Sequence, residues 1–327
     1  MKYKILITGG AGYVGAVLVP KLLMEGHTIS VVDLFMYGDN VLPNHERLKK
    51  HKLDIRNISE INNIIKGHDM VIHLACISND PSFELNPNLG KSINLDAFRP
   101  LVECSISNGV KRFIYASSSS VYGIKNEKNV HEDMSLEPLT DYSKFKAECE
   151  EILNEYKSED FTTVTIRPAT VCGYSPRQRL DVVLNIFANN AYHNREISVF
   201  GGSQLRPNIN IKDMVRAYQT LIHADKEIIN GEIYNAGDMN YSVLELAEIT
   251  KDVMGEDIKL TITESDDNRS YHISSDKILK VLGFKTENTL KDAVEDVKKA
   301  FEDNRLEDPL NNDYYYNIKM MQKNNLK

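Results

Sequence analysis

The sequence predicts an α/β protein, in which a doubly wound parallel sheet is joined to a smaller, mixed C-terminal lobe. Three observations support this prediction. Short apolar runs alternate with helical patterns through the first half, a glycine-rich turn follows the first run, and the second half loses the alternation. Strands that alternate with helices connect by right-handed crossovers, which place helices on both faces of a parallel sheet.

The expected strands are short runs rich in Val, Ile or Phe, at residues 3–8, 29–32, 70–75, 112–116, 163–166 and 232–235. Helical spacing of apolar residues predicts helices at 11–24, 57–66, 91–108, 142–157, 179–193, 212–223, 241–254, 274–282 and 289–302. Ser242 and Thr289 suit N-caps, and Gly255 and Gly283 suit C-terminal stops.

Composition excludes several classes of partner. The chain of 327 residues carries 39 Lys+Arg against 47 Asp+Glu, a net charge of -8, which disfavours general binding to nucleic acid or an anionic membrane. No stretch reaches the ~18–20 apolar residues of a membrane span. The N-terminus has the pattern of a core strand and not of a signal peptide, so we expect a cytoplasmic protein.

The four cysteines, at positions 76, 104, 149 and 172, form no C-x-x-C pair and have no histidine cluster nearby in the sequence. This pattern predicts reduced, buried thiols and no metal site. His73 lies within an expected core strand and is interpreted as a packed structural histidine.

Residues 8–15 read T-G-G-A-G-Y-V-G, so Gly9, Gly12 and Gly15 follow the G-x-x-G-x-x-G spacing between a strand and a helix. Glycine lets the backbone approach a diphosphate closely, and the helix N-terminus offers free N–H groups to it. Asp33, 18 positions after Gly15, suits a ribose diol and would repel a 2′-phosphate, which favours NAD over NADP. The cofactor residues expected here are Gly9, Gly12, Tyr13, Val14, Gly15, Asp33 and Leu34.

Tyr142 and Lys146 form a Y-x-x-x-K pair on one face of an expected helix. A nearby ammonium stabilises a phenolate, which makes a tyrosine usable as an acid or base near neutral pH. Upstream, the strand at 112–116 runs into a serine cluster that includes Ser118. Because ligands bind beyond the carboxyl ends of the strands in such sheets, we expect Ser118 beside the tyrosine.

With these residues, the chain resembles the NAD-dependent nucleotide-sugar epimerase/dehydratase family of extended short-chain dehydrogenases/reductases, which have a Rossmann-type fold. The resemblance implies that Tyr142 is the acid/base for a sugar C4 hydroxyl. It also implies that Lys146 binds the nicotinamide ribose and lowers the pKa of the tyrosine, with Ser118 as the third catalytic residue. Further cofactor residues that it implies are Asp54, Ile55, Leu74, Ala75, Asn94, Tyr142, Lys146 and Pro168.

The second half carries the expected binding residues for a nucleoside-diphosphate sugar. A guanidinium fork suits phosphate oxygens, and Arg206 matches the family arginine that grips the diphosphate, although Pro207 and Asn210 depart from the family pattern. The expected substrate-binding residues are Ser118, Thr170, Arg177, Arg179, Asn185, Arg206 and Arg269.

Two serines separate this chain from one branch of the family. Sugar 4,6-dehydratases carry acidic residues just after the catalytic Ser/Thr, whereas this chain has Ser119 and Ser120 there. A hydroxyl is a poor acid/base for eliminating water, which argues against dehydration and more weakly against decarboxylation.

The leading hypothesis is therefore an NAD-dependent nucleotide-sugar epimerase. A 4-dehydrogenase or 4-keto-reductase with net redox change would use the same residues, and a non-catalytic NAD-binding regulatory protein is a third reading.

We expect residues 1–172 plus about 211–240 to form the NAD-binding domain, and about 173–210 and 241–327 the substrate lobe. The family implies a homodimer through the helices at 91–108 and 142–157, although packing within one subunit also explains Leu101, Ile106 and Leu153. The role of the tyrosine-rich tail stays open.

Overall fold

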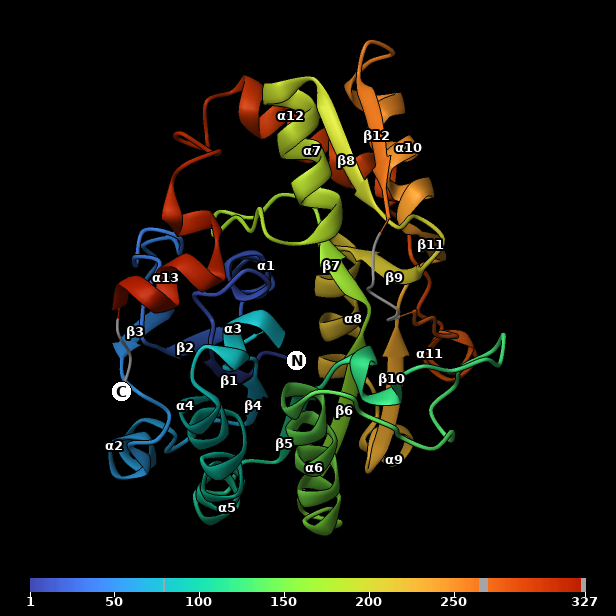
Figure 1. Cartoon of the computed structure of the whole chain (residues 1–327). Helices are drawn as coiled ribbons and strands as arrows, with labels where there is room; N and C mark the ends of the chain where they lie inside the picture. Colours follow the sequence, from blue (N-terminus) through green and yellow to red (C-terminus); the bar gives the residue numbers. More distant parts are fainter. Residues whose placement is uncertain (79, 265–269, 325–327) are drawn as a thin grey trace.

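The main sheet of the protein is parallel and has seven strands. The computed structural model describes residues 1–78, 80–264 and 270–324. Its strand order, β10-β6-β5-β4-β1-β2-β3, reverses direction between β1 and β4 and so gives the predicted doubly wound topology (Figure 1). The strands are β1 (Lys4–Thr8), β2 (Thr28–Asp33), β3 (Leu48–Lys52), β4 (Met70–His73), β5 (Arg112–Ala116), β6 (Thr162–Pro168) and β10 (Glu232–Ala236).

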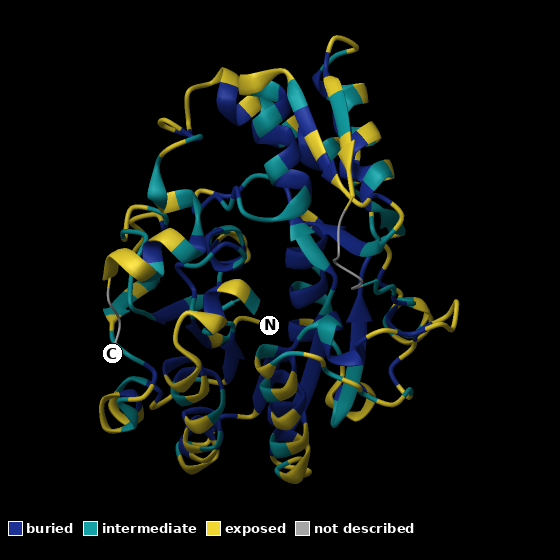
Figure 2. Cartoon of the chain, in the orientation of Figure 1, coloured by how far each residue is buried: buried dark blue, intermediate teal, exposed yellow. Residues whose placement is uncertain are grey.

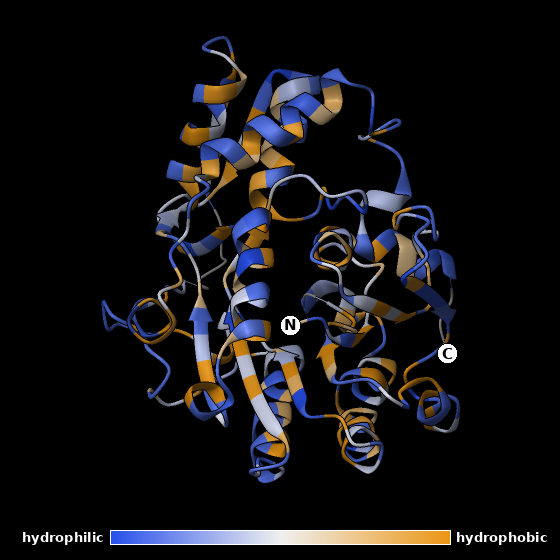
Figure 3. Cartoon of the chain, turned by 180° about the vertical axis from the view of Figure 1, so that it is seen from behind, coloured by the Kyte–Doolittle hydropathy of each residue, from blue (hydrophilic) through white to orange (hydrophobic). Residues whose placement is uncertain are grey.

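Helices cover both faces of this sheet, as the alternating sequence pattern requires. On one face, α1 (Gly15–Met24) packs against α8 (Ile211–His223). On the other face, α5 (Phe98–Ser107) contacts both α2 (Ile58–Ile64) and α6 (Asp141–Glu155). Apart from the edge strand β3, the strands between these layers are largely buried, and from behind they show runs of apolar residues (Figures 2 and 3).

The smaller lobe has its own apolar core. Helices α7 (Val183–Asn194), α10 (Val243–Met254) and α12 (Leu290–Glu302) pack together beside the parallel pair β8 (Glu196–Phe200) and β12 (Lys259–Thr263). A three-stranded sheet links the lobe to the main sheet and consists of β7 (Thr170–Cys172), β9 (Leu205–Asn210) and β11 (Asn240–Ser242). The short helices are α3 (Asp80–Glu84), α4 (Pro87–Lys91), α9 (Lys226–Ile229) and α11 (Asp276–Leu282).

The predicted helix signals act as expected. Ser242 and Thr289 begin α10 and α12 with reciprocal capping boxes, in which each hydroxyl accepts a backbone N–H three residues later. Gly255 and Gly283 follow the ends of α10 and α11 with φ angles of 131° and 66°, a region that favours glycine.

Two predicted helix starts were wrong. The first helix begins at Gly15 and not at residue 11, because the backbone N–H of Ala11 donates to the Asp33 carboxylate and holds the chain in a turn. Helix α7 begins at Val183 and not at 179, because Arg179 and Asp181 form an ion pair at 2.8 Å in the preceding loop.

The predicted helix at 91–108 is interrupted by a π-helical turn at Ser92–Asp96, just before α5. The Asn94 side chain in this turn bonds the backbone N–H and C=O of Ile77 at 2.8 and 3.0 Å. A π-turn adds a residue to the helix and re-aims a side chain, which here braces the loop after β4.

The tyrosine-rich tail is ordered against the body of the protein. From α12 the chain descends past a 3-10 turn at Asp313–Tyr315 to α13 (Asn317–Asn324), which contacts α3 (Figure 1). The backbone N–H of Leu180 donates to the Tyr315 carbonyl at 2.9 Å. Within the described ranges, every helix is too short or too polar to cross a membrane.

Packing within one subunit explains most of the residues considered for a dimer contact. Leu101 and Leu153 are buried in the core, whereas Ile106 is exposed.

His73 is buried against Phe98 and Tyr115, as predicted. Cys104, Cys149 and Cys172 are buried free thiols, but the prediction was wrong for the fourth cysteine, Cys76, which is half-buried beside a cavity.

Candidate functional site

A cavity of about 790 Å³ lies at the carboxyl ends of β1, β4 and β5, between the main sheet and the smaller lobe. This is the place where ligands bind in doubly wound sheets. Most residues singled out in the sequence line it, namely Gly9, Gly12, Tyr13, Val14, Gly15, Asp33, Leu34, Asp54, Ile55, Leu74, Ala75, Ser118, Tyr142, Pro168, Thr170, Arg177, Arg179 and Arg206.

Three of the expected site residues stand behind the cavity wall instead. Asn94 braces the Ile77 backbone, and Lys146 is 4% exposed. Asn185 is 1% exposed and donates to the Tyr13 hydroxyl at 3.0 Å, so the expectation that it faces a substrate is corrected to a bracing role beneath the turn. Arg269 lies outside the described residues.

The glycine turn fits a diphosphate closely. A Cβ at Gly9 would lie 2.5 Å from the backbone nitrogen of Ala75, and Gly9 has a φ of +72°, so only glycine is accommodated. A Cβ at Gly15 would lie 2.4 Å from the Gly10 carbonyl oxygen. The turn therefore brings bare backbone and the N-terminus of α1 to the cavity, which is the arrangement that binds the diphosphate of a dinucleotide.

The carboxylate of Asp33 closes the end of β2. It accepts the backbone N–H of Ala11 at 3.0 Å and that of Phe35 at 2.8 Å. Burial raises the pKa of this carboxyl, and the two N–H groups oppose that rise. The same oxygens retain lone pairs for the hydroxyls of a ribose.

The proposed catalytic residues come together at the end of β5. Ser118 follows the strand, and its Oγ accepts the N–H of Ser120 at 3.1 Å, which caps the 3-10 turn at Ser119–Tyr122. Tyr142 lies in the first turn of α6, which Thr140 caps. The Nζ atom of Lys146 donates to the Ala116 carbonyl at 2.6 Å and lies 5.9 Å from the centroid of the Tyr142 ring.

The electrostatics of Tyr142 depend on several neighbours. Burial raises the pKa of its phenol most, and the nearby Cys76 and Asp80 raise it further. The charge of Arg179 and a hydrogen bond from Ser118 lower it. Burial therefore favours the protonated phenol, and the neighbouring cation and hydroxyl favour the phenolate.

A buried polar network supports α6 from behind. Arg167 on β6 donates to both carboxylate oxygens of Glu150 on α6, with Nη2 at 2.6 Å from Oε2. Its Nη1 donates to the Tyr122 hydroxyl at 2.7 Å, and the Ser117 hydroxyl donates to Glu150. These bonds join α6, β5 and β6 immediately behind Ser118.

Several residues on the cavity wall were not predicted from the sequence, namely Tyr37, Cys76, Ser78, Asp80 and Asn317. Cys76, Ser78 and Asp80 follow β4 directly, so the rule that pointed to Ser118 after β5 would have found them as well. Nothing local marks Asn317, whose partners are 136 to 280 residues away in sequence.

The sequence model of the NAD dependent epimerase/dehydratase family matches residues 5–237. The chain belongs to this family. Its members depend on NAD, and the turn and carboxylate described above fit that cofactor, so NAD is the cofactor of this protein. The family consists of enzymes, epimerases and dehydratases, and this protein is one of them.

Three similar proteins span most of the chain. A protein of Bacillus subtilis described as an uncharacterized UDP-glucose epimerase, YtcB, is 30% identical over 80% of this chain and 85% of its own length. The solved UDP-N-acetylglucosamine 4-epimerase of Methanobrevibacter ruminantium, in complex with UDP-N-acetylmuramic acid, is 26% identical, covers 91% of this chain and 99% of its own, and has a TM-score of 0.82. The dTDP-glucose 4,6-dehydratase DesIV of Streptomyces venezuelae, 22% identical, covers 94% of this chain and 99% of its own with a TM-score of 0.84, and shows the shared fold alone.

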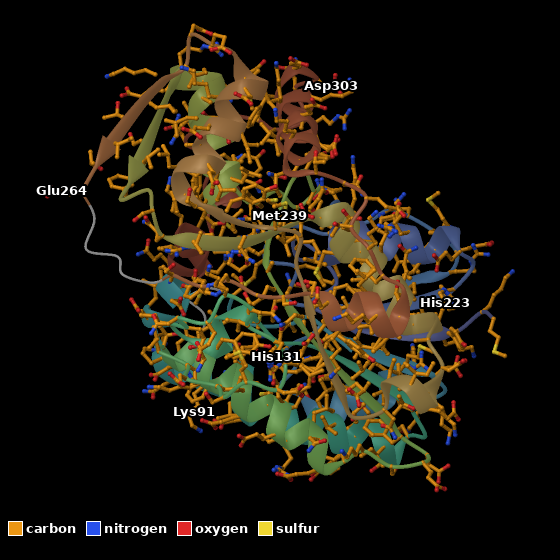
Figure 4. The ribbon with its side chains drawn as sticks, turned by 90° about the vertical axis from the view of Figure 1, so that its right-hand side faces the viewer. Lys91, His131, His223, Met239, Glu264 and Asp303 are labelled. Carbon is orange, nitrogen blue, oxygen red and sulfur yellow. The ribbon has the colours of Figure 1, made fainter. Side chains whose placement is uncertain are left out.

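One group of side chains away from the cavity resembles a metal site. Glu25, His27 and His223 approach one another at the surface, and His223 lies on the side of the molecule opposite to Glu264 (Figure 4). However, the Nδ1 atom of His27 accepts the backbone N–H of Tyr3 at 3.0 Å. A neutral His27 therefore carries its proton on Nε2, which donates to Glu25 at 3.2 Å and has no lone pair for a metal.

Proposed function

We propose that this protein is a nucleotide-sugar 4-epimerase that oxidises the C4 hydroxyl of a nucleoside-diphosphate sugar and then reduces the 4-keto intermediate on its other face. The observation that carries the proposal is the convergence of Ser118 and Tyr142 on the cavity beside the glycine turn, with Lys146 held just behind Tyr142 at the end of β5. The two relatives described as epimerases support the same reaction.

The reaction divides the work between the cofactor and the chain. NAD, held by the glycine turn and Asp33, would supply the hydride-transfer chemistry at C4. Tyr142 accepts the proton of the C4 hydroxyl and gives it back after the sugar has turned. Ser118 lies within hydrogen-bonding reach of that phenol and positions the C4 hydroxyl of the sugar. The ammonium of Lys146, fixed by the Ala116 carbonyl, favours the phenolate electrostatically.

Specificity belongs to the smaller lobe in this proposal. Thr170 and Arg206 line the cavity on that side, and Arg206 provides a cation for the diphosphate of the sugar nucleotide. The division into an NAD-binding domain of residues 1–172 plus about 211–240 and a substrate lobe follows from the same assignment. We also propose a cytoplasmic homodimer, with the exposed Ile106 of α5 near its interface.

The same residues would serve a 4-dehydrogenase or 4-keto-reductase, so the fate of the hydride decides between the two. UDP-glucose and UDP-N-acetylglucosamine, each with deuterium at C4, are incubated with the purified enzyme. We expect an epimeric product that keeps the label at C4 while NAD stays bound. Label that appears in free NADH would reject epimerisation in favour of the dehydrogenase.

A pair of tyrosine variants shows whether the reaction depends on the named phenol. Tyr142→Phe is expected to lower kcat by about 10³-fold or more, because general acid–base catalysis alone contributes about 10²–10⁴-fold. Tyr156→Phe, at the far end of the same helix, is expected to retain full activity. Equal activity in both variants would favour a non-catalytic role for the fold.

A further inference from the structure

One side chain of the C-terminal helix joins loops from both lobes at the cavity. The Oδ1 atom of Asn317 accepts the hydroxyl of Tyr37 at 3.1 Å and a hydrogen bond from Nη2 of Arg177. Its Nδ2 donates to the Ser78 hydroxyl at 2.9 Å, and its backbone N–H donates to the Asp181 carboxylate at 2.8 Å. Asn317 is 5% exposed, so these bonds form out of contact with bulk water.

The partners of Asn317 come from three separate loops. Tyr37 follows β2, Ser78 follows β4, and Arg177 and Asp181 lie between β7 and α7. All of them line the cavity, together with Met321 from the next turn of α13. The C-terminal helix therefore crosses from the smaller lobe to the main sheet at the side of the cavity where Asp33 lies.

Arg177 is a buried cation without a countercharge of its own. It is 4% exposed, and within the described part of the chain no carboxylate forms an ion pair with it; the charge of Asp181 reaches Arg177, but Asp181 is paired with Arg179 at 2.8 Å. Its guanidinium stacks 3.5 Å from the centroid of the Tyr37 ring, and its Nε has no hydrogen-bond partner. Burial lowers the pKa of Arg177. Buried charges are normally paired, so an unpaired guanidinium at a cavity wall points to an anionic ligand.

Two neighbours show which anion this is. Arg177 stacks on the ring of Tyr37, four residues after Asp33, which suits the ribose of the cofactor. Ser175, two residues before Arg177, donates to the Tyr13 carbonyl in the glycine turn at 2.7 Å. The guanidinium therefore lies between the ribose end of the groove and the turn that fits the diphosphate. The sequence pattern assigned Arg177 to the sugar nucleotide, but its position favours the cofactor.

We propose that α13 is part of the cofactor site: Asn317 ties the two lobes together over the dinucleotide groove and holds Arg177 against the diphosphate of NAD. This inference rests on the NAD dependence of the family and does not depend on epimerisation. Asn317 acts through Arg177 and is a positioning residue. The C-terminal tail, whose role the sequence leaves open, then retains the cofactor.

The decisive variant is Asn317→Asp, which has the same shape. Its carboxylate still accepts hydrogen bonds from Tyr37 and Arg177, but it neutralises the Arg177 cation and adds a negative charge beside the diphosphate. Affinities for NAD, adenosine and UDP are measured by calorimetry on protein freed of bound nucleotide. We expect the NAD affinity to fall about tenfold or more, while adenosine and UDP change less than about twofold.

Two further variants complete the test. Gln322→Ala, on the exposed side of α13, is the matched control and is expected to bind NAD like the wild type. Asn317→Ala removes the side-chain bonds without adding charge and is expected to weaken NAD binding in the same direction. The melting temperature without ligand reports whether each variant folds, and Asn317→Ala decides the question if Asn317→Asp does not fold.

Three outcomes would overturn the proposal. NAD binding within about twofold of the wild type in the folded Asn317 variant would show that the tail is only structural. Equal losses for NAD and adenosine would assign Asn317 to the ribose loop and not to the diphosphate. A loss for UDP without a loss for NAD would return Arg177 to the sugar nucleotide. The three affinities do not depend on which reaction the enzyme catalyses, so this test stands even if the epimerase proposal fails.

Discussion

Two buried arginines in this protein have opposite environments. Arg167, behind α6, donates to both carboxylate oxygens of Glu150 and to the Tyr122 hydroxyl. Burial opposes its charge, but Glu150 outweighs that effect and raises the pKa of Arg167. Arg177, at the cavity, has the neutral partners Asn317 and Tyr37, and burial lowers its pKa.

The difference separates a cation that the fold satisfies from one that a ligand must satisfy. A buried arginine whose donors all find partners inside the protein stabilises the arrangement of its neighbours, here α6, β5 and β6. A buried arginine that lacks a countercharge raises the free energy of the unliganded fold, and an anion that binds there recovers it. Each of the following variants tests one side of this comparison.

Removing the negative partner of Arg167 should have the largest effect on stability. Glu150→Gln leaves Arg167 buried without a negative partner, and the free energy of unfolding is expected to fall by about 3–5 kcal/mol. Chemical denaturation measures this change. Glu151→Gln, one residue later and exposed, is the matched control and should stay within about 0.5 kcal/mol of the wild type. Similar values for both variants would mean that the ion pair contributes little.

Arg177→Gln should behave in the opposite way. Removal of an unpaired buried charge is expected to leave the unfolding free energy of the unliganded protein within about 1 kcal/mol of the wild type. The affinity for NAD is expected to fall about tenfold, equivalent to about 1.4 kcal/mol. A large loss of stability with unchanged NAD binding would place Arg177 in the same class as Arg167.

His73 extends the comparison to a buried group that stays neutral. Burial lowers its pKa to about 3, so the folded protein resists protonation that the unfolded chain accepts near its ordinary value of 6.5. The stability that His73 contributes is therefore complete above the unfolded pKa and is lost as the pH falls. From pH 7 to pH 6 the expected loss is about 0.7 kcal/mol.

The variant His73→Gln cannot titrate and should flatten this acid dependence. His45→Gln, at an exposed histidine, should keep the acid dependence of the wild type. Melting curves between pH 7 and pH 6 measure both. An unchanged slope in His73→Gln would mean that other groups take up the protons on unfolding.

The smallest effect is expected from the carboxylate beside Tyr142. The charge of Asp80 adds to burial and to Cys76 in raising the pKa of Tyr142. Asp80→Asn should therefore lower that pKa and move the phenol limb of the pH–rate profile to lower pH. Asp96→Asn, an exposed change away from the cavity, should not move it. A shift to higher pH in Asp80→Asn would contradict the assigned sign.

The sequence was most informative where local rules decide structure. The alternation of apolar runs predicted six of the seven strands of the main sheet, and missed β3, whose L-K-K-H-K segment is polar at a sheet edge. Capping residues located the starts of α10 and α12 because a cap acts within a single turn. The first residue of α1 was missed because Asp33, 22 residues away, holds Ala11 outside the helix.

The residues of the candidate site show the same difference between local signals and distant partners. The glycine turn and the Y-x-x-x-K pair carry their chemistry in short spacings, and the structure brings the turn and Tyr142 to one cavity, with Lys146 behind its wall. The orientation of the Asn185 side chain could not be predicted from the sequence, because it depends on Tyr13, 172 residues earlier. Asn317 was missed for the same reason, since helical spacing says nothing about partners in other loops.

The position of Asn317 has a consequence for the order in which the protein is made. Its partners Tyr37 and Ser78 leave the ribosome 280 and 239 residues earlier, and an N-terminal domain folds as it emerges. A nascent chain thus presents its glycine turn long before α13 exists to enclose it. In the role proposed for Asn317, firm capture of the dinucleotide is deferred until α13 has been made, so a product truncated before Asn317 would lack it.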